Sequence, residues 1–240
     1  MHMVVLAGGF GTRLQPVLKD LPKPLAPVGD KCFLELRLNT FKAYGLVEFT
    51  LCLHYMPEKI KEYFGDGSKF GYKINYSIEE KPMGTGGAIG ILRGHLNETF
   101  CAINADTCMD MDIQACIAEH RKSHAIATLV VARVENLSRF GRIELDQDGL
   151  VKGFYEKDES LSGSGYINAG FYIFEPEIFD YIPENRNVSL EKEVFPVLFE
   201  KEQKVKGYPY AENFFDIGIP SDYYRFQQWL DGKEFPEVGG

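Results

Sequence analysis

The feature that most constrains this chain is a short apolar run followed by closely spaced glycines. Val4–Ala7 is apolar and Gly8–Gly11 contains three glycines, a pattern typical of a buried first strand that leads into a tight loop. Such a loop lets successive backbone amides point at one anion, and Arg13 and Lys23 add positive charge nearby. The pattern predicts a phosphate-binding loop, although a plain turn would also explain the glycines alone.

Two common nucleotide-binding loops do not fit this segment. A P-loop ends in glycine, lysine and then serine or threonine, a combination that does not occur here. A dinucleotide-binding loop needs a third glycine where Leu14 stands. The second expected strand also ends in Leu53-His54-Tyr55 rather than in an acidic residue, which disfavours a nicotinamide-dependent oxidoreductase.

Composition and charge narrow the class of protein further. The 240 residues are 45% hydrophobic and 25% charged, which suits a soluble protein with one sizeable core. The formal net charge of −9 argues against a nucleic-acid or membrane-surface partner, since a polyanion would be repelled. The five cysteines include no Cys-x-x-Cys pair, so we expect reduced thiols in a cytoplasmic protein. Neither a membrane span nor a signal peptide is expected.

Hydrophobic periodicity predicts an α/β fold. Helices are expected at 33–44, 57–64, 113–120, 176–182, 190–200 and 220–230, with a further helical pattern through 92–96. Strands are expected from Val4 and at 47–53, 72–78, 100–107, 126–134 and 166–174, with a hairpin at 140–145 and 150–155. We therefore predict a Rossmann-like, mixed but mainly parallel sheet sandwiched by helices, with a small substrate-binding β subregion.

A second glycine-rich loop follows the strand at 72–78. Gly84–Ala88 has four small residues in five positions, which leaves room for a planar base or a ribose to approach the backbone. Two glycine loops that each leave a strand and enter a helix are typical of the carboxyl-end edge of an open parallel sheet. A plain turn is the less favoured interpretation of this loop.

The strand at 100–107 delivers a carboxylate, Asp106, to the edge where α/β sheets bind their ligands. An ionised group at the end of a buried run needs a partner, and a divalent metal beside phosphates is the simplest one. Asp110 and Asp112 follow, but we expect them to cap the next helix. The five histidines are scattered without ligand spacing, so none is assigned to catalysis.

The ordered set of motifs resembles the sugar-1-phosphate nucleotidylyltransferase family. The matching pieces occur in the family's order over nearly the whole chain: Gly8–Leu14, Pro22-Lys23-Pro24, Gly84–Gly87, Asn104–Thr107, Glu156-Lys157, Asn168-Ala169-Gly170 and Phe215–Gly218. Within the family, Asp20–Pro24, Met83–Ala88 and Phe215–Tyr223 are most similar to D-glycero-α-D-manno-heptose-1-phosphate guanylyltransferases. One departure is Ala105, since many relatives have glycine before the aspartate that binds the metal.

The resemblance implies attack of a sugar 1-phosphate oxygen on the α-phosphate of a nucleoside triphosphate, which gives a nucleoside-diphosphate sugar and pyrophosphate. Mg²⁺ is the implied cofactor, shared by Asp106 and Asp216. The implied catalytic residues are Arg13 on the departing pyrophosphate, Lys23 near the α-phosphate, Lys157 on the sugar phosphate, and the two aspartates. The implied nucleotide-binding residues are Leu6, Ala7, Gly8, Gly9, Gly11, Thr12, Arg13, Glu80, Gly84, Thr85 and Gly86. The implied sugar-binding residues are Asn104, Gly141, Glu156, Lys157 and Asn168.

GTP and D-glycero-α-D-manno-heptose 1-phosphate are the substrates that the resemblance favours, in a protein for capsule or surface polysaccharide biosynthesis. One domain spanning 1–240 would bind mainly the nucleotide through 1–125 and mainly the sugar phosphate through 126–240. Glu79 or Glu80 would accept hydrogen bonds from the amide and amino donors of guanine, and Gly141 would leave room for the sugar ring.

Three questions stay open on the sequence alone. A uridylyl-, thymidylyl- or cytidylyltransferase for a hexose 1-phosphate keeps the reaction and changes the substrates. A non-catalytic subunit that senses nucleotide sugar keeps only the binding. The aromatic residues near the end of the chain fit either a core, which we favour, or the surface of a homodimer.

Overall fold

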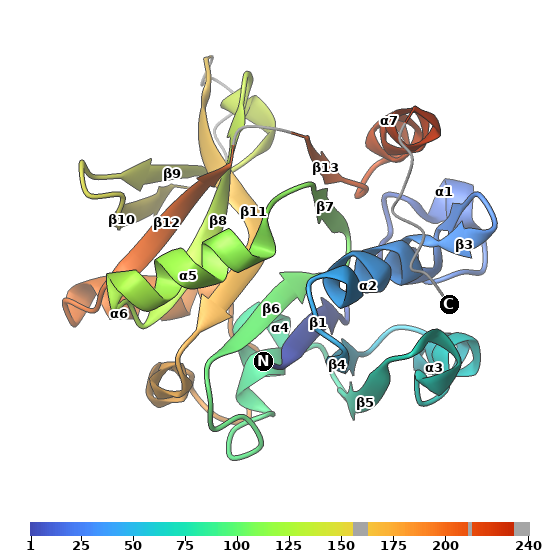
Figure 1. Cartoon of the computed structure of the whole chain (residues 1–240), viewed down its shortest axis with the longest axis horizontal. Helices are drawn as coiled ribbons and strands as arrows, with labels where there is room; N and C mark the ends of the chain where they lie inside the picture. The colour runs from blue at the N-terminus through green and yellow to red at the C-terminus, as the bar shows by residue number, and fades with distance from the viewer. Residues whose placement is uncertain (156–162, 211–212, 233–240) are drawn as a thin grey trace. The chain divides into compact units, whose positions relative to one another are not determined.

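The computed structural model describes residues 1–155, 163–210 and 213–232, which pack into two compact units (Figure 1). The first unit consists of His2–Pro82, Asn104–Cys108 and the segment from Phe215 on. The second consists of Met83–Ile103 and Met109–Phe214, together with Met1. The chain therefore passes between the units more than once. The predicted halves 1–125 and 126–240 concern binding and stay a prediction.

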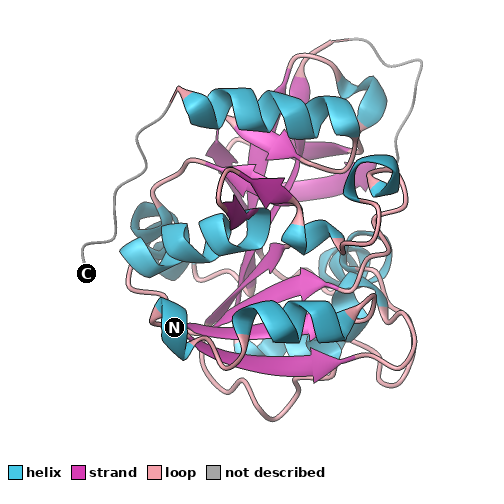
Figure 2. Ribbon diagram, turned by 90° about the vertical axis from the view of Figure 1, so that its right-hand side faces the viewer, coloured by secondary structure: helices cyan, strands magenta, loops and turns pink. Residues whose placement is uncertain are grey.

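The first unit is built on three parallel strands. Strand β1 (Met3–Ala7) pairs with β4 (Glu48–Leu53), which pairs in turn with β5 (Lys73–Ile78). Parallel neighbours need crossover connections, and helices α2 (Phe33–Ala43) and α3 (Pro57–Phe64) supply them. Figure 2 shows the strands in magenta and the helices in cyan. The residues that follow these strands therefore share the carboxyl-end edge of the sheet.

Local signals explain why both crossover helices were predictable. In α2 the Sγ atom of the N-cap Cys32 accepts a hydrogen bond from Glu35 N at 3.4 Å, and the apolar face is buried. Helix α3 begins with a proline in its first turn and stops at Gly65, whose φ is 58°. Both predictions, at 33–44 and 57–64, are confirmed to within a residue.

The first unit also contains a buried cluster that joins distant parts of the sequence. Around it lie α1 (Gln15–Leu18), the 3-10 helix η1 (Lys23–Leu25), the paired strands β2 (Pro27–Val28) and β3 (Lys31–Cys32), and α7 (Pro220–Asp231). A second 3-10 helix, η2 (Ser68–Phe70), packs the Phe70 ring against Tyr63 and Tyr72. Strands β7 (Thr107–Met109) and β13 (Phe214–Asp216) pair with each other. One buried cluster includes Leu14, Phe33, Phe215, Ile217 and Phe226. The glycine loop and the end of β13 are thus anchored in the same core.

The second unit is organised around the long strand β11 (Gly165–Phe174). It is antiparallel to β6 (Phe100–Asn104), β8 (Ala127–Val134) and β9 (Arg142–Leu145). Strand β12 (Val205–Tyr210) pairs in parallel with β8, and β9 forms the predicted hairpin with β10 (Val151–Tyr155). Helix α5 (Ile113–Ser123) packs along β12 (Figure 1) and is capped by Asp112, as predicted.

One of the three helical segments predicted in the second unit outside α5 is displaced, and the other two are confirmed as helical. Helix α4 (Gly84–Gly90) begins inside the second glycine loop and ends before the predicted helical stretch 92–96, which Gly94 interrupts at a φ of 79°. The helical segment predicted at 190–200 is confirmed, and it consists of a π-helical turn, η5 (Leu190–Val194), followed by α6 (Phe195–Glu200). The segment predicted as a helix at 176–182 is a 3-10 helix, η4 (Pro176–Tyr181), and another, η3 (Leu137–Arg139), precedes β9.

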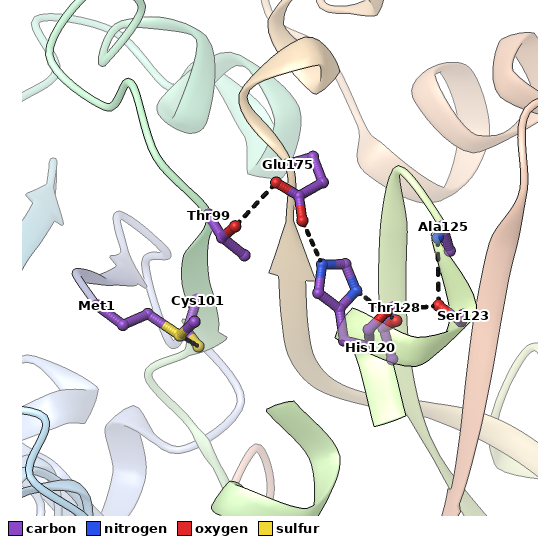
Figure 3. Close-up of polar contacts among 8 residues, drawn as sticks. All are labelled: Met1, Thr99, Cys101, His120, Ser123, Ala125, Thr128 and Glu175. Atoms are coloured by element: carbon purple, nitrogen blue, oxygen red, sulfur yellow. Dashed lines mark hydrogen bonds and ion pairs between the residues drawn. The ribbon is translucent and has the colours of Figure 1, made fainter. Parts of the chain in front are cut away.

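A buried polar group in the second unit links helix α5 to three strands or their flanks (Figure 3). His120 Nε2 lies 3.0 Å from Glu175 Oε1, and its Nδ1 lies 2.7 Å from Thr128 Oγ1. Thr99 Oγ1 donates to the other oxygen of Glu175 at 2.8 Å. Burial lowers the pKa of His120, and the Glu175 carboxylate opposes part of that shift. His120 is therefore a hydrogen-bonded group in the interior of this unit.

The structure also tests the predicted fold class and the predicted state of the cysteines. The strands form a mixed sheet with helices packed against it, which confirms the predicted α/β fold class. All five cysteines are free and buried. Among the described residues, every helix is too short or too polar to cross a membrane.

Candidate active site

The glycine loop after β1 is fixed at one end and open at the other. Gly11 has a φ of 62°, a conformation that glycine adopts without strain. Leu14 N donates to Gly11 O at 3.0 Å, and the Leu14 side chain is fully buried. By contrast, a Cβ placed on Gly9 would meet no atom within 4 Å. The loop therefore offers open space beside Gly9 while its position is set by the core.

Lys23 joins this loop to the predicted metal-binding aspartate. A Cβ on Gly11 would lie 3.1 Å from Lys23 Cβ, so the lysine stem runs directly over the glycine. The Lys23 ammonium donates to Asp106 Oδ2 at 2.7 Å, with the lysine side chain 12% exposed and the aspartate side chain 34% exposed. The absence of a side chain at Gly11 thus allows the lysine to reach Asp106.

Asp216 is the second predicted metal ligand, and the backbone brings it close to the first. Ile217 N donates to Asp106 O at 2.9 Å, and Gly218 N donates to Asp216 Oδ1 at 2.8 Å. Burial and the neighbouring Asp106 carboxylate raise the pKa of Asp216, while Lys23 opposes that rise. Two carboxylates that repel each other at a partly buried position are suited to a cation between them.

Arg13 reaches the same place from the glycine loop. Its side chain is exposed, as is that of Thr12. A Cβ on Gly218 would lie 2.8 Å from Asp216 Oδ1 and 3.3 Å from Arg13 Nη2, so the glycine lets both groups approach one backbone position. The structure therefore brings four of the five predicted catalytic residues together within the first unit: Arg13, Lys23, Asp106 and Asp216.

The end of β5 distinguishes the two glutamates that the sequence left as alternatives. Glu79 is buried, and its carboxylate oxygens lie 3.2 and 3.4 Å from where a Cβ on Gly8 would stand. Its backbone is fixed by a hydrogen bond to Leu53 O at 2.8 Å. Glu80, the residue that we had placed in the nucleotide site, is exposed. The carboxylate beside the glycine loop is therefore that of Glu79.

The other predicted residues of the first unit lie at the ends of neighbouring segments. Leu6 and Ala7 finish strand β1, and Leu6 O accepts a hydrogen bond from Ala105 N at 3.0 Å. Asn104 is half-buried, and its carbonyl oxygen accepts from Thr107 Oγ1 at 3.3 Å. Ala105 is buried, so the methyl group that replaces the usual glycine packs inside.

The second glycine loop differs from its predicted form. A Cβ on Gly84 would lie 2.5 Å from Val188 O, and one on Gly87 would lie 2.8 Å from Arg186 O. The amides of Gly86 and Gly87 both donate to Val188 O, at 2.9 and 3.2 Å. The room that we expected beside these glycines for a base or ribose is occupied by the chain at 186–188. This packing explains why glycines, which have no side chain, occupy these positions.

Two predicted sugar-site residues of the second unit are also engaged by the protein itself. A Cβ on Gly141 would lie 2.9 Å from Tyr155 O, so the expected room on that side is filled by a carbonyl group. Asn168 Nδ2 donates to Tyr172 Oη at 2.7 Å and to Glu191 Oε1 at 2.9 Å. The sequence offered no signal for Glu191 or Tyr172, because both lie in segments whose pattern indicates only a helix or a strand.

Two predicted residues, Glu156 and Lys157, lie outside the described residues. Their roles on the sugar and its phosphate stay predictions. The predicted nucleotide-binding and metal-binding residues lie mostly in the first unit, whereas Thr85, Gly141 and Asn168 lie in the second.

Comparison with known proteins identifies the family to which the chain belongs. A model of the Nucleotidyl transferase family matches residues 2–231. The chain belongs to this family, and the sugar-1-phosphate nucleotidylyltransferases are the class that its fold and motifs define. The resemblance inferred from the motifs is therefore confirmed.

Particular relatives and a solved structure refine the comparison. The chain is 37% identical over 227 residues to D-glycero-alpha-D-manno-heptose 1-phosphate guanylyltransferase of Campylobacter jejuni, covering 94% of this chain and 98% of the relative. It is 39% identical over 224 residues to mannose-1-phosphate guanylyltransferase of Mycobacterium tuberculosis, where it covers 92% of this chain but spans only 62% of the relative. The crystal structure of HddC from Yersinia pseudotuberculosis in complex with GMP-PN has a TM-score of 0.83 at 30% identity, covering 95% and 99% of the two chains.

Proposed function

We propose that this protein transfers a guanylyl group from GTP to D-glycero-α-D-manno-heptose 1-phosphate, releasing GDP-heptose and pyrophosphate. The observation that carries the proposal is the convergence of Lys23, Asp106, Asp216 and Arg13 at the end of an open glycine loop. This set of charges suits a phosphoryl centre and is difficult to explain by folding alone, because the two carboxylates repel each other.

The reaction needs positioning and charge neutralisation more than covalent chemistry from the protein. A sugar-phosphate oxygen attacks the α-phosphorus, the bond to the bridging oxygen breaks, and pyrophosphate leaves with the electron pair. The open backbone near Gly9 would hold the triphosphate, and Lys23 would stabilise the charge that develops at the α-phosphate. Arg13 is exposed beside the glycine loop and would pair with the leaving pyrophosphate. Lys157 is proposed to hold the sugar phosphate.

The carboxylates fit Mg²⁺ as the cofactor. The pKa of Asp216 is raised by burial and by Asp106, so a divalent cation between the two groups would remove the repulsion. No cluster of three or more candidate ligands occurs among the residues that the structure describes, so phosphate oxygens and water would complete the shell. When bound, Mg²⁺ would neutralise phosphate charge and hold it in line for attack.

Glu79 supports guanine as the base. A carboxylate accepts two hydrogen bonds side by side, which matches the adjacent N–H and NH₂ donors of guanine. Uracil and thymine present one such donor flanked by carbonyl oxygens, which a carboxylate repels. The guanylyltransferase relatives and the GMP-PN complex of HddC support the same base.

The heptose is supported by the extent of the match to the Campylobacter enzyme, which this chain covers almost end to end. Asn104, Gly141, Glu156, Lys157 and Asn168 are the proposed sugar-side residues. Mannose 1-phosphate is the principal competing acceptor, because the mycobacterial relative that carries that name is equally similar over this chain.

A substrate screen tests the proposal. Pyrophosphate release should be measured with each of GTP, UTP, dTTP and CTP against heptose, mannose and glucose 1-phosphates. The highest kcat/KM is expected for GTP with the heptose. A preference for another triphosphate would refute the base assignment, and nucleotide-sugar binding without pyrophosphate release would indicate a sensing subunit instead.

A matched pair of variants tests the role of Glu79. Glu79→Gln should lower kcat/KM for GTP by about 10- to 100-fold, because one oxygen acceptor becomes a donor. Glu80→Gln changes the adjacent, exposed carboxylate in the same way and should stay within about twofold of wild type. Equal effects of the two substitutions would remove Glu79 from the base site.

A further inference from the structure

One carboxylate in the second unit accepts an unusually complete set of hydrogen bonds. Glu191 Oε1 accepts from Asn168 Nδ2 at 2.9 Å and from Tyr172 Oη at 3.1 Å. Its Oε2 accepts from Ser189 Oγ at 3.1 Å and from Thr85 Oγ1 at 3.4 Å. Four side chains from three segments of the chain thus converge on one carboxylate.

The number of bonds decides what kind of role Glu191 can have. An ionised carboxylate offers about four lone-pair positions, and here four donors use them. Asn168 is committed in the same way, because both Nδ2 hydrogens are used and its Oδ1 accepts from Gly170 N at 3.0 Å. In this arrangement the Glu191 carboxylate is held by its four donors and in turn fixes their positions.

The backbone around Glu191 fastens the same segment. Ser189 caps the π-helical turn η5 by accepting from Lys192 N at 3.2 Å, and Leu190 N donates to Thr85 Oγ1 at 2.9 Å. Val188 O accepts the amides of the first turn of α4. π-Helical turns are rare and occur frequently at functional sites. Here the turn aims Glu191 at Thr85 and Asn168 together.

We propose that Glu191 is a positioning residue that holds the nucleotide-side Thr85 segment and the sugar-side Asn168 in one fixed arrangement. The inference rests on the proposed function, in which Asn168 is a sugar-side residue, and on the nucleotide-binding role predicted for Thr85. One carboxylate shared by both would make the binding of each substrate depend on the same side chain. Loss of the carboxylate should therefore weaken both substrates at once.

Two substitutions in the same turn separate positioning from general stability. Glu191→Gln preserves shape but replaces one acceptor oxygen by an NH₂ group, which then faces two donors. Glu193→Gln makes the same chemical change two residues on, where the carboxylate accepts from Ser189 N at 3.1 Å and pairs with Arg186 at 2.6 Å. Glu191→Gln should raise KM for both GTP and the sugar phosphate at least about 10-fold. Glu193→Gln should leave both within about twofold.

A third variant checks the connection to the sugar side. Tyr172→Phe removes one of the four donors, the one that also accepts from Asn168. It should raise KM for the sugar phosphate several-fold and leave KM for GTP unchanged. Wild-type KM values in Glu191→Gln would overturn the proposal. It would also be overturned if Glu193→Gln raised both KM values equally while losing the same melting temperature.

Hydrogen exchange provides a readout that needs no substrate. Glu191→Gln should speed exchange of the amides at 84–90 and 168–170, and Glu193→Gln should not. Unchanged exchange in Glu191→Gln would refute the positioning role directly. If wild-type protein releases no pyrophosphate with any substrate pair, the proposed function fails while the exchange result still decides whether Glu191 fixes these segments.

Discussion

Replacing Gly11 with alanine tests whether the loop conformation holds Lys23 in place. An L residue at a φ of 62° costs about 1–2 kcal/mol relative to glycine. The new Cβ would also lie 3.1 Å from Lys23 Cβ, so the lysine stem must move. A total loss of about 2 kcal/mol in the free energy of unfolding corresponds to a fall of roughly 4–8 °C in melting temperature. Because the lysine also donates to Asp106, turnover should fall together with stability.

Gly9→Ala is the matched control, since it adds the same methyl group two residues earlier. A Cβ at this position meets no atom within 4 Å, and the backbone is not in the left-handed region. Stability should therefore be unchanged or higher by about 0.4–1 kcal/mol, because alanine restricts the unfolded chain. If the triphosphate lies against Gly9, the methyl group displaces it, and kcat/KM for the nucleotide should fall by roughly 100-fold.

The two variants are compared by thermal unfolding and by steady-state pyrophosphate release. The expected result separates the two properties: Gly11→Ala loses both stability and activity, whereas Gly9→Ala loses activity and keeps its stability. A Gly11→Ala protein as stable as wild type would refute the conformational reasoning. Wild-type kinetics in Gly9→Ala would show that the open space beside Gly9 does not receive the substrate.

Three further predictions concern the metal, the buried histidine and the thiols. Mg²⁺ should raise the melting temperature of the wild-type protein, because the cation relieves the repulsion between the Asp106 and Asp216 carboxylates. It should scarcely raise that of Asp216→Asn. Equal rises in the two proteins would exclude Asp216 as a ligand. Since burial lowers the pKa of His120, the unfolded chain binds a proton that the folded chain does not. The stability that depends on neutral His120 is therefore complete above about pH 6.5 and is lost as the pH falls below that value. In urea unfolding at pH 5–7, the free energy of unfolding of His120→Gln should vary less with pH than that of the wild type. Superimposable pH profiles of the two proteins would contradict this. The five buried thiols should not react with Ellman's reagent until the protein unfolds, since burial raises, for example, the pKa of Cys32 to about 11; rapid labelling of native protein would contradict this.

The sequence predicted the parts of the structure that local chemistry determines. Helix α3 is bounded by a proline and a glycine, and the β9–β10 hairpin alternates around a turn that Gly149 completes at a φ of 74°. Asp106 was recognised because a carboxylate directly follows a buried strand. These signals lie within a few residues of the features they predict, so no tertiary information was needed.

Other parts depend on segments far away in the chain, which one sequence does not reveal. The glycines of α4 suggested an open ligand-binding loop because their actual neighbours lie about a hundred residues later. The choice between Glu79 and Glu80 required knowing which side chain turns inward at the end of β5. Glu191 was missed because its pattern is that of an ordinary amphipathic helix, whereas its role follows from four donors that meet only in the folded protein.

The packing of α4 against the chain at 182–190 has a consequence for the order of folding. A short segment with four glycines has little intrinsic tendency to be helical, so α4 depends on tertiary contacts for its conformation. Those contacts join residues 105 positions apart, such as Thr85 and Leu190, and such distant pairings are slow to form. The segment that carries Thr85 is therefore expected to become ordered only after the chain at 182–190 has been synthesised and has packed against it.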